Sequence, residues 1–383
     1  MQALEYRPSL PRYLATRAVR RLGPTALHLT ELDPPRLPDP EWVPLRPRLS
    51  GICGSDQAMI DGHASLYMSS LTSSPFVPGH EIVAEVTAGD ERGKRVVVEP
   101  ALGCRARGVE PQCEECREGR HALCRGVTEG SVGAGLQIGY CRETGGGWSE
   151  ALVAHRSQLH AVPDDLEDED AVMIEPLACA VHAARRAQLE PSATVAVIGA
   201  GTIGVLTVAA LRERHPDATI LAVAKHRGQE LEVRRAGADH TCAPGRLHLE
   251  GVRMTGARRL VGYGNRELLL GGFDSVIDCV GSGDSLEAAV AAVKPRGTVL
   301  LVGMPGQVSA DLGMAWQREV EIRGAYGYES DFAEAIELAR KLRPGRLVAH
   351  GWELRDYRRA LDESKRAARA GKVKTVFDMR RAA

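Results

Sequence analysis

The chain of 383 residues is long enough for two domains with a sizeable core, and its contents of 44% hydrophobic and 26% charged residues are ordinary for a soluble globular protein. A formal net charge of -1 gives no general reason to expect nucleic acid or an anionic membrane as a partner. Residues 1–21 carry five arginines but no apolar segment of the secretory type, so we expect a cytoplasmic protein. Its nine cysteines are then reduced, as metal ligands or buried thiols rather than disulfides.

The first motif with chemistry lies between two predicted strands. A strand over 45–49 leads into the segment GICGSD at 51–56, and Pro78-Gly-His80-Glu81 precedes a second strand at 82–86. A lone cysteine or histidine is ordinarily a structural residue. Together, however, a thiolate and a neutral imidazole are ligands of open, catalytic zinc sites, which a third protein ligand and water complete. The pair Cys53 and His80 therefore predicts metal binding.

A second cysteine pattern follows a predicted strand at 94–100. Cys113-x2-Cys116-x7-Cys124 has the spacing of a metal knuckle with a following loop, and Cys104 can supply a fourth thiolate. A closed site of four thiolates leaves no position for substrate, so this lobe predicts a structural zinc. A group of plain buried thiols is the alternative.

The stretch TVAVIGAGTIGVLTVAALR at 194–212 reads as strand, tight turn and helix. Gly199 allows the turn, Gly201 lets the backbone approach a pyrophosphate, and Gly204 lets the helix pack on the strand, with the phosphate at the helix N-terminus. Thr202 and Ile203 lie within the same turn. The alternative, a membrane helix, conflicts with the three glycines and with a length short of the ~20 residues that span a bilayer. The motif predicts dinucleotide binding.

Further strands at 219–223, 272–281 and 297–302 alternate with helical segments such as 284–293, which predicts a parallel, doubly wound sheet. We expect the first forty residues to be Pro-rich and irregular, with Arg-rich and β-like fragments, and the basic segment 246–259 to be irregular. The chain from residue 331 is predicted to be helical, with a β-like end at 371–377.

These motifs, in this order, resemble the zinc-containing medium-chain dehydrogenase/reductase family, which includes alcohol, sorbitol, threonine and glucose dehydrogenases. The resemblance covers nearly the whole chain. It implies an α/β protein in which a GroES-like, β-rich catalytic domain at 1–163 and 325–383, with its zinc lobe at 104–124, is interrupted by a Rossmann domain at 164–324. Eight residues separate Cys104 from Cys113, which is more than the family's usual spacing, so the resemblance leaves the role of Cys104 open.

The resemblance also implies roles at the catalytic zinc. Glu175, in the segment Ile174-Glu-Pro-Leu177, matches the third zinc-site position, either direct or through water; a helix-capping carboxylate is the alternative. Ser55 matches the hydroxyl that takes the alcohol proton, Asp56 would orient His80, and Glu81 would exchange with ligands at the metal. The histidine that ends the family's proton relay is here Ala58, so the route of proton exit stays open.

The end of the strand at 219–223 predicts the cofactor. NAD enzymes place an acidic residue there for the ribose 2′-hydroxyl, whereas NADP enzymes use cations on the 2′-phosphate. Counting back from Ala236-Gly-Ala-Asp239, which resembles a family motif, puts Ala224 at the acidic position, followed by Lys225, His226 and Arg227. We therefore expect NADP to be preferred and NAD to be possible; ordinary surface charges are the alternative reading.

The sequence thus predicts a zinc-dependent oxidoreductase that transfers hydride between the CH–OH group of an alcohol, polyol or sugar and NADP. A zinc-independent NADPH reductase of the same fold, or a non-catalytic nucleotide-binding protein with a structural zinc, are the alternatives. Its partner is a small-molecule substrate, with no nucleic acid and no membrane, and family habit implies a homodimer or homotetramer.

Overall fold

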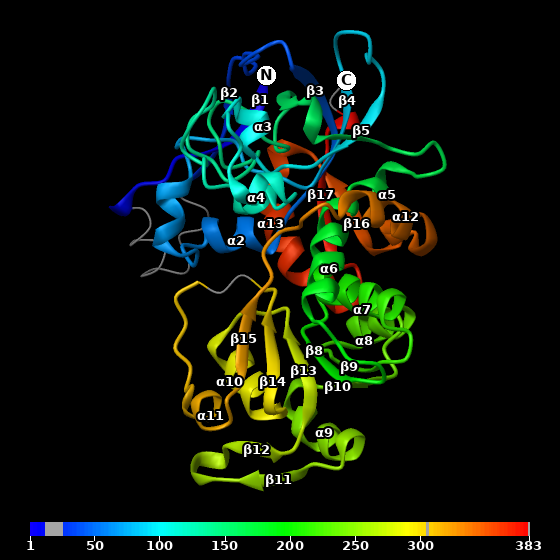
Figure 1. Ribbon diagram of the computed structural model, residues 1–383. Coiled ribbons are helices and arrows are strands. Elements are labelled where there is room, and N and C mark those ends of the chain that lie inside the picture. The colour runs from blue at the N-terminus through cyan, green and yellow to red at the C-terminus, as the bar shows by residue number, and fades with distance from the viewer. Residues whose placement is uncertain (12–25, 304–305, 382–383) are drawn as a thin grey trace. The chain divides into compact units, whose positions relative to one another are not determined.

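The computed structural model describes residues 1–11, 26–303 and 306–381 (Figure 1), and its chain divides into two units. Unit 1 contains Met1–Ala178, Tyr328–Ala367 and Lys374–Ala383, and unit 2 contains Cys179–Gly327 and Ala368–Val373. The predicted nucleotide-binding domain at 164–324 differs from unit 2 mainly at 164–178, which cluster with unit 1. Much of the arginine-rich N-terminal stretch, at 12–25, lies outside the described residues.

Unit 1 is built on a mixed sheet in the order β16-β17-β3-β4-β5-β7, with β6 also pairing β3, and a separate antiparallel pair β1-β2. Its strands are β1 (Gln2–Tyr6), β2 (Leu27–Glu31), β3 (Trp42–Gly51), β4 (Ile82–Val86), β5 (Arg95–Val98), β6 (Leu152–His155), β7 (Leu159–Ala161), β16 (Val348–Trp352) and β17 (Lys374–Asp378). Its helices are α2 (Gly54–Ile60), α3 (Cys104–Arg107), α4 (Glu114–Arg117), α5 (Asp168–Ala171), α12 (Phe332–Leu342) and α13 (Tyr357–Arg366), and α6 (Ile174–Arg186) begins here.

Strand β3 is the organising element of this sheet. It is longer than predicted because it pairs with three neighbours, β4, β6 and β17, along different parts of its length. Trp42, Leu45 and Ile82 of β3 and β4 are buried in one hydrophobic cluster. Trp148 and Phe377 meet edge to face in a second cluster, with ring centroids 5.2 Å apart. Two hydrophobic clusters therefore stabilise the ends of strands β3, β4 and β17, where the candidate metal ligands lie.

Unit 2 is the predicted parallel, doubly wound sheet, in the order β10-β9-β8-β13-β14-β15 (Figure 1). Helices α7 and α8 pack together, as do α9 and α10, and β11 and β12 form a separate hairpin. The elements are β8 (Thr194–Ile198), α7 (Thr202–Arg214), β9 (Thr219–Val223), α8 (Arg227–Arg235), β10 (His240–Cys242), α9 (Leu247–Thr255), β11 (Arg258–Val261), β12 (Glu267–Leu270), β13 (Phe273–Asp278), α10 (Gly283–Ala292), β14 (Val293–Leu301), α11 (Gly313–Gln317) and β15 (Glu321–Gly324).

Two local expectations were wrong. The basic segment 246–259 is not irregular: it contains helix α9, in which Leu247 and Gly251 are buried and Arg253 is exposed. The region after residue 331, expected to be helical, contains strand β16, which pairs with β17, a strand that a local pattern does not show as its partner. The β-like fragments expected in the first forty residues include β1 and β2, which pair with each other. Within the described residues, no helix is long and apolar enough to cross a membrane.

Candidate metal and nucleotide sites

The register of the unit 1 sheet brings together two of the predicted metal ligands. Ser50 of β3 pairs with Ile82 of β4, so the residues just after β3 and just before β4 lie at one edge of the sheet. Cys53 stands there, immediately before helix α2, and its backbone N–H donates to Asp56 Oδ2 at 3.0 Å. The thiol of Cys53 in turn interacts with the imidazole of His80. Residues 27 positions apart thus meet because two strands pair antiparallel.

A buried carboxylate faces the ring of His80. Its Nδ1 lies 3.4 Å from Oδ1 of Asp56, and the Asp56 side chain is completely buried. Gly79 before it has φ of +97°, and a Cβ there would lie 2.4 Å from the Trp148 ring, so only glycine fits this turn. Burial alone lowers the pKa of His80, but Asp56 and Cys53 raise it well above its ordinary value. A carboxylate that orients an imidazole in this way is the usual support of a metal-binding histidine.

Glu81 takes part in an ion pair that the sequence did not predict. Both of its carboxylate oxygens contact Nζ of Lys374, at 2.5 and 2.6 Å, and the two side chains are 1% and 3% exposed. Lys374 starts strand β17, which pairs with the end of β3. A Cβ on Gly51 would lie 1.7 Å from Glu81 Oε2, so this glycine makes room for the carboxylate. The only sequence signal for Lys374 is a lysine inside an apolar strand.

Glu175 lies in the first turn of α6 and is 4% exposed. Its charge and that of Cys53 both act on Lys374, whose pKa burial would lower but these neighbouring anions and Glu81 raise. Among the described residues, however, Cys53, His80 and Glu175 do not form a group whose ligand atoms all lie within 4.8 Å of one another. The donor types suit zinc. The structure brings the thiol and the imidazole together and leaves the carboxylate farther away.

Ser55 follows Cys53 by two residues, in the first turn of α2, and is half-buried. Its hydroxyl interacts with the phenol of Tyr140, a residue that the sequence did not point to. The Tyr140 ring also packs on His80, with ring centroids 5.9 Å apart. Burial raises the pKa of Tyr140, so the phenol is held as a neutral hydroxyl. Tyr140 is thus a further wall of the Cys53–His80 site.

The four cysteines of the lobe form a compact group. The thiols of Cys104, Cys113, Cys116 and Cys124 lie within 4.8 Å of one another, and Cys104 Sγ is 3.6 Å from Cys124 Sγ. Thiolates around one tetrahedral zinc are about 3.8 Å apart, given Zn–S bonds of about 2.3 Å. Cys104, whose role the spacing left open, therefore lies where a fourth ligand belongs.

Backbone N–H groups donate to sulfur atoms of the lobe, although burial raises the pKa of the Cys116 and Cys124 thiols. The N–H of Cys104 donates to Cys116 Sγ and that of Cys113 donates to Cys104 Sγ, each at 3.3 Å. Burial alone would raise the pKa of the Cys113 thiol, but N–H donors including that of Arg125 lower it to about 6. The donor set and its geometry fit a closed, structural zinc.

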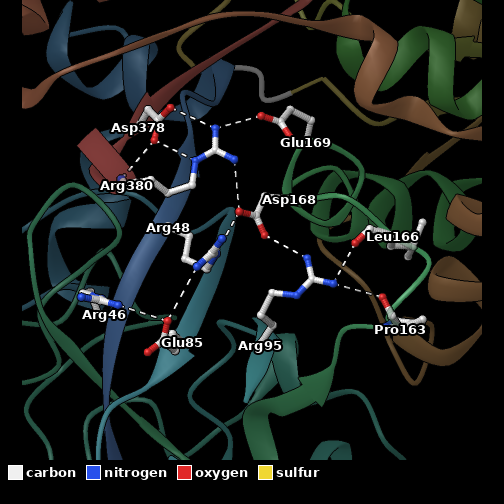
Figure 2. Close-up of polar contacts among 10 residues, drawn as sticks. All are labelled: Arg46, Arg48, Glu85, Arg95, Pro163, Leu166, Asp168, Glu169, Asp378 and Arg380. Atoms are coloured by element: carbon white, nitrogen blue, oxygen red, sulfur yellow. Dashed lines mark hydrogen bonds and ion pairs between the residues drawn. The ribbon is translucent and has the colours of Figure 1, made fainter. Parts of the chain in front are cut away.

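A buried carboxylate fixes the segment that leads to Glu175. Figure 2 shows Asp168 at the centre of three arginines: it accepts from Arg48 Nε at 2.8 Å, Arg95 Nη1 at 3.1 Å and Arg380 Nη1 at 3.2 Å. Arg95 also donates to the carbonyl oxygens at 163 and 166. These bonds attach residues 163–170 to β3, β5 and the chain after β17, which is why this segment belongs to unit 1.

The glycine-rich turn of unit 2 has the shape that dinucleotide binding requires. Gly199 has φ of +98°, and a Cβ on Gly204 would lie 1.9 Å from the Gly199 carbonyl oxygen, so the third glycine is needed where α7 meets β8. A Cβ on Gly201 would meet no atom of the described residues within 4 Å. The protein's own packing does not require this glycine, whereas a pyrophosphate approaching the backbone does. Thr202 and Ile203 begin helix α7.

The residues expected to select the cofactor follow β9. Ala224 is buried, and Lys225 and Arg227 are exposed on either side of the half-buried His226. Arg227 begins helix α8. An uncharged residue followed by accessible cations is compatible with an additional phosphate on the ribose.

A β-rich unit with a cysteine lobe and a doubly wound unit with a GxGxxG turn together define the class of proteins that join a GroES-like domain to a Rossmann domain. Comparison with known proteins agrees. Residues 39–164 match the alcohol dehydrogenase GroES-like domain, and residues 202–341 match the zinc-binding dehydrogenase domain. The chain belongs to the zinc-containing medium-chain dehydrogenase/reductase family.

Individual relatives are distant in sequence. The chain is 29% identical to a sorbitol dehydrogenase of Arabidopsis thaliana over 92% of this chain and 93% of the relative. It is 27% identical to an L-idonate 5-dehydrogenase of Vitis vinifera over 89% of this chain and 88% of the relative. The fold is similar to that of 2R,3R-butanediol dehydrogenase from Bacillus subtilis, with a TM-score of 0.73 at 21% identity, over 98% and 99% of the two chains.

Proposed function

We propose that the chain is a zinc-dependent dehydrogenase that transfers hydride between the CH–OH group of a polyol, sugar or other alcohol and NADP, with NAD as the poorer cofactor. The observation that carries this proposal is the meeting of Cys53, His80 and Asp56 at one edge of the unit 1 sheet. Relatives named for sorbitol and L-idonate favour substrates with several hydroxyl groups.

Cys53 and His80 would hold the catalytic zinc, with Glu175 as third ligand, directly or through water. Bound there, the ion would supply the Lewis acidity that favours the alkoxide form of an alcohol. His80 would have to be neutral to hold the ion, so the protonated form that Asp56 and Cys53 favour would compete with metal binding. Asp56 Oδ1 faces Nδ1 of His80, which would leave the other ring nitrogen for the metal. Glu81 stays paired with Lys374.

Ser55 would take the proton of the alcohol. The first turn of α2 places the Ser55 hydroxyl, which interacts with the Tyr140 phenol, so Tyr140 would help to orient that hydroxyl. The four lobe cysteines would hold a second, structural zinc. In unit 2, Gly199, Gly201 and Gly204 would receive the pyrophosphate.

The enzyme class is tested with purified, zinc-loaded protein, either NADP+ or NAD+, and a panel of polyols, aldoses and simple alcohols, by following the absorbance of the reduced nicotinamide. Cys53→Ala should abolish turnover while cofactor affinity is retained. The matched control is Cys242→Ala, a half-buried cysteine of unit 2 that is outside every proposed ligand set. Metal analysis should find two zinc ions per chain, and one in Cys53→Ala. Full activity of Cys53→Ala, or of the zinc-stripped enzyme, would refute the mechanism.

The cofactor preference is tested separately. Ala224→Asp places a carboxylate where the 2′-phosphate would lie, so kcat/KM for NADP+ should fall while that for NAD+ is kept or rises. Arg227→Ala should lower kcat/KM for NADP+ alone. Arg234→Ala, at the far end of α8 and 48% exposed, is the control. Equal effects of Arg227→Ala on both cofactors would contradict the phosphate assignment.

A further inference from the structure

Arg107 occupies an unusual position beside the cysteine lobe. It ends helix α3, which begins at Cys104, and it lies within the eight residues that separate Cys104 from Cys113. Although it is an arginine, its side chain is completely buried. A buried guanidinium needs an acceptor for each of its donors, because an unpaired one is costly.

The acceptors of Arg107 are carbonyl oxygens. Its Nε donates to Leu102, and its two terminal nitrogens donate to residues of the loop that follows the lobe. The bonds are to Leu102 (2.9 Å), Glu129 (2.9 Å), Val132 (3.1 Å), Gly133 (3.1 Å) and Gly135 (2.5 Å). Within the described residues, no carboxylate forms a hydrogen bond or ion pair with it. Five neutral acceptors hold one cation, and they join α3 to the loop 129–135.

The main chain of Arg107 is attached to the same loop. Its carbonyl oxygen accepts from the N–H of Ser131 at 2.9 Å, and a Cβ on Gly130, where φ is +89°, would lie 2.2 Å from that oxygen. Its N–H donates to the Gly103 carbonyl at 3.1 Å. The turn that returns the chain from Cys104 to Cys113 is therefore clamped at Arg107 from both its backbone and its side chain.

The thiols of the lobe act on this cation. Burial lowers the pKa of Arg107, and the charges of Cys141, Cys124, Cys104 and Glu143 oppose that decrease. Four thiolates around Zn²⁺ would carry a net charge of −2, which a nearby cation stabilises. Arg107 is completely buried and electrostatically coupled to two of the four ligands, Cys104 and Cys124.

We propose that Arg107 is the positioning residue of the cysteine lobe. By binding the carbonyl groups of loop 129–135, Arg107 folds the long connection between Cys104 and Cys113 back, so that Cys104 becomes the fourth ligand. The positive charge of Arg107 also offsets the negative charge of the site. The inference rests on the proposed structural zinc at these four cysteines. The longer spacing between Cys104 and Cys113 is thus compatible with four-thiolate binding, because Arg107 holds Cys104 near the other cysteines, as a short spacing would otherwise do.

The test uses the full chain with Cys53→Ser, so that bound metal reports on the lobe alone, and Co²⁺ in place of zinc. The thiolate-to-cobalt charge-transfer absorbance of the parent should indicate four thiolates. Arg107→Met should weaken Co²⁺ affinity about 10- to 100-fold and reduce the absorbance to that of Cys104→Ser. Arg105→Met, an exposed arginine of the same helix, is the matched control and should change neither.

Two further variants keep the result decisive if Arg107→Met folds poorly. Arg107→Lys keeps the charge but not the fork of donors, so its Co²⁺ affinity should fall between those of the parent and Cys104→Ser. In the Cys104→Ser chain, adding Arg107→Lys should cost little further affinity, because the ligand it positions is already gone. Parent-like affinity of the Arg107 variants, or equal losses with and without Cys104, would overturn the proposal. A parent chain without a four-thiolate spectrum would instead refute the zinc lobe itself.

Discussion

The ion pair between Lys374 and Glu81 leads to the prediction with the largest expected effect. Both side chains are almost inaccessible, at 3% and 1% exposure, and the ammonium nitrogen contacts both carboxylate oxygens, at 2.5 and 2.6 Å. Lys374→Met leaves a buried carboxylate without its cation. Breaking a buried pair from one side costs about 3–5 kcal/mol, which lowers the ratio of folded to unfolded protein by on the order of 10² to 10³.

The double variant separates the ion pair from the packing of the two side chains. Replacing both groups by apolar residues, as in Glu81→Leu with Lys374→Met, removes the unpaired charge and should recover most of the loss. The coupling free energy from the cycle of single and double variants should therefore exceed about 1.5 kcal/mol, well above the ~0.5 kcal/mol within which independent sites add.

The free energy of unfolding is measured by urea titration at one fixed zinc concentration, since bound metal shifts apparent stability. Trp316→Phe is the background, because Trp42, Trp148 and Trp352 then report on unit 1 alone. A double variant as unstable as the sum of the two single variants would refute the reasoning and show that shape, rather than charge, makes the pair necessary.

Three further predictions concern other buried groups. Glu99 forms hydrogen bonds with His121 and His160 at 3.1 and 3.0 Å, and although burial alone raises the pKa of Glu99, these histidines lower it overall. The stabilisation by ionised Glu99 is therefore present above about pH 4.3, the ordinary glutamate pKa, and is lost as pH falls through the lowered value. Glu99→Gln should lower Tm near neutral pH and flatten the acid side of the plot of Tm against pH, and an unchanged acid side would contradict this. Asp168→Asn removes the charge shared by three arginines and should lower the free energy of unfolding, measured with urea, by about 2–3 kcal/mol. Glu85→Gln, at a glutamate whose side chain is 25% exposed, should lower it by less than about 1 kcal/mol. Similar losses would show that Asp168 contributes no more than an exposed ion pair. Gly204→Ala should lower the Tm of the cofactor-free protein, because the new Cβ would lie 1.9 Å from a carbonyl oxygen. Gly201→Ala should leave that Tm unchanged but weaken the binding of NADPH, which is measured by the fluorescence of NADPH. Normal NADPH binding by Gly201→Ala would show that the pyrophosphate lies elsewhere.

Local patterns in the sequence predicted the elements that form from neighbouring residues. The strands at 82–86 and 219–223 begin and end where predicted, because each is an apolar run bounded by turn residues. The fold class, a β-rich unit and a parallel doubly wound sheet, is confirmed, since alternating strands and helices allow few other arrangements. The segment 246–259 was misread because its arginines hid the buried face of α9.

The sequence by itself determined the family and predicted the ligands, because Cys53, His80 and the four lobe cysteines lie in short motifs whose residues occur together. Tertiary structure alone decided which of them meet: the strand register joins Cys53 to His80, and the fold of the lobe brings Cys104 within 4.8 Å of the other three cysteines. The same holds for Lys374, which reaches Glu81 across 293 residues. A buried charge is stable only beside its partner, and the partner of a residue so distant in sequence is chosen by the packing of strands and loops, not by the residues next to it.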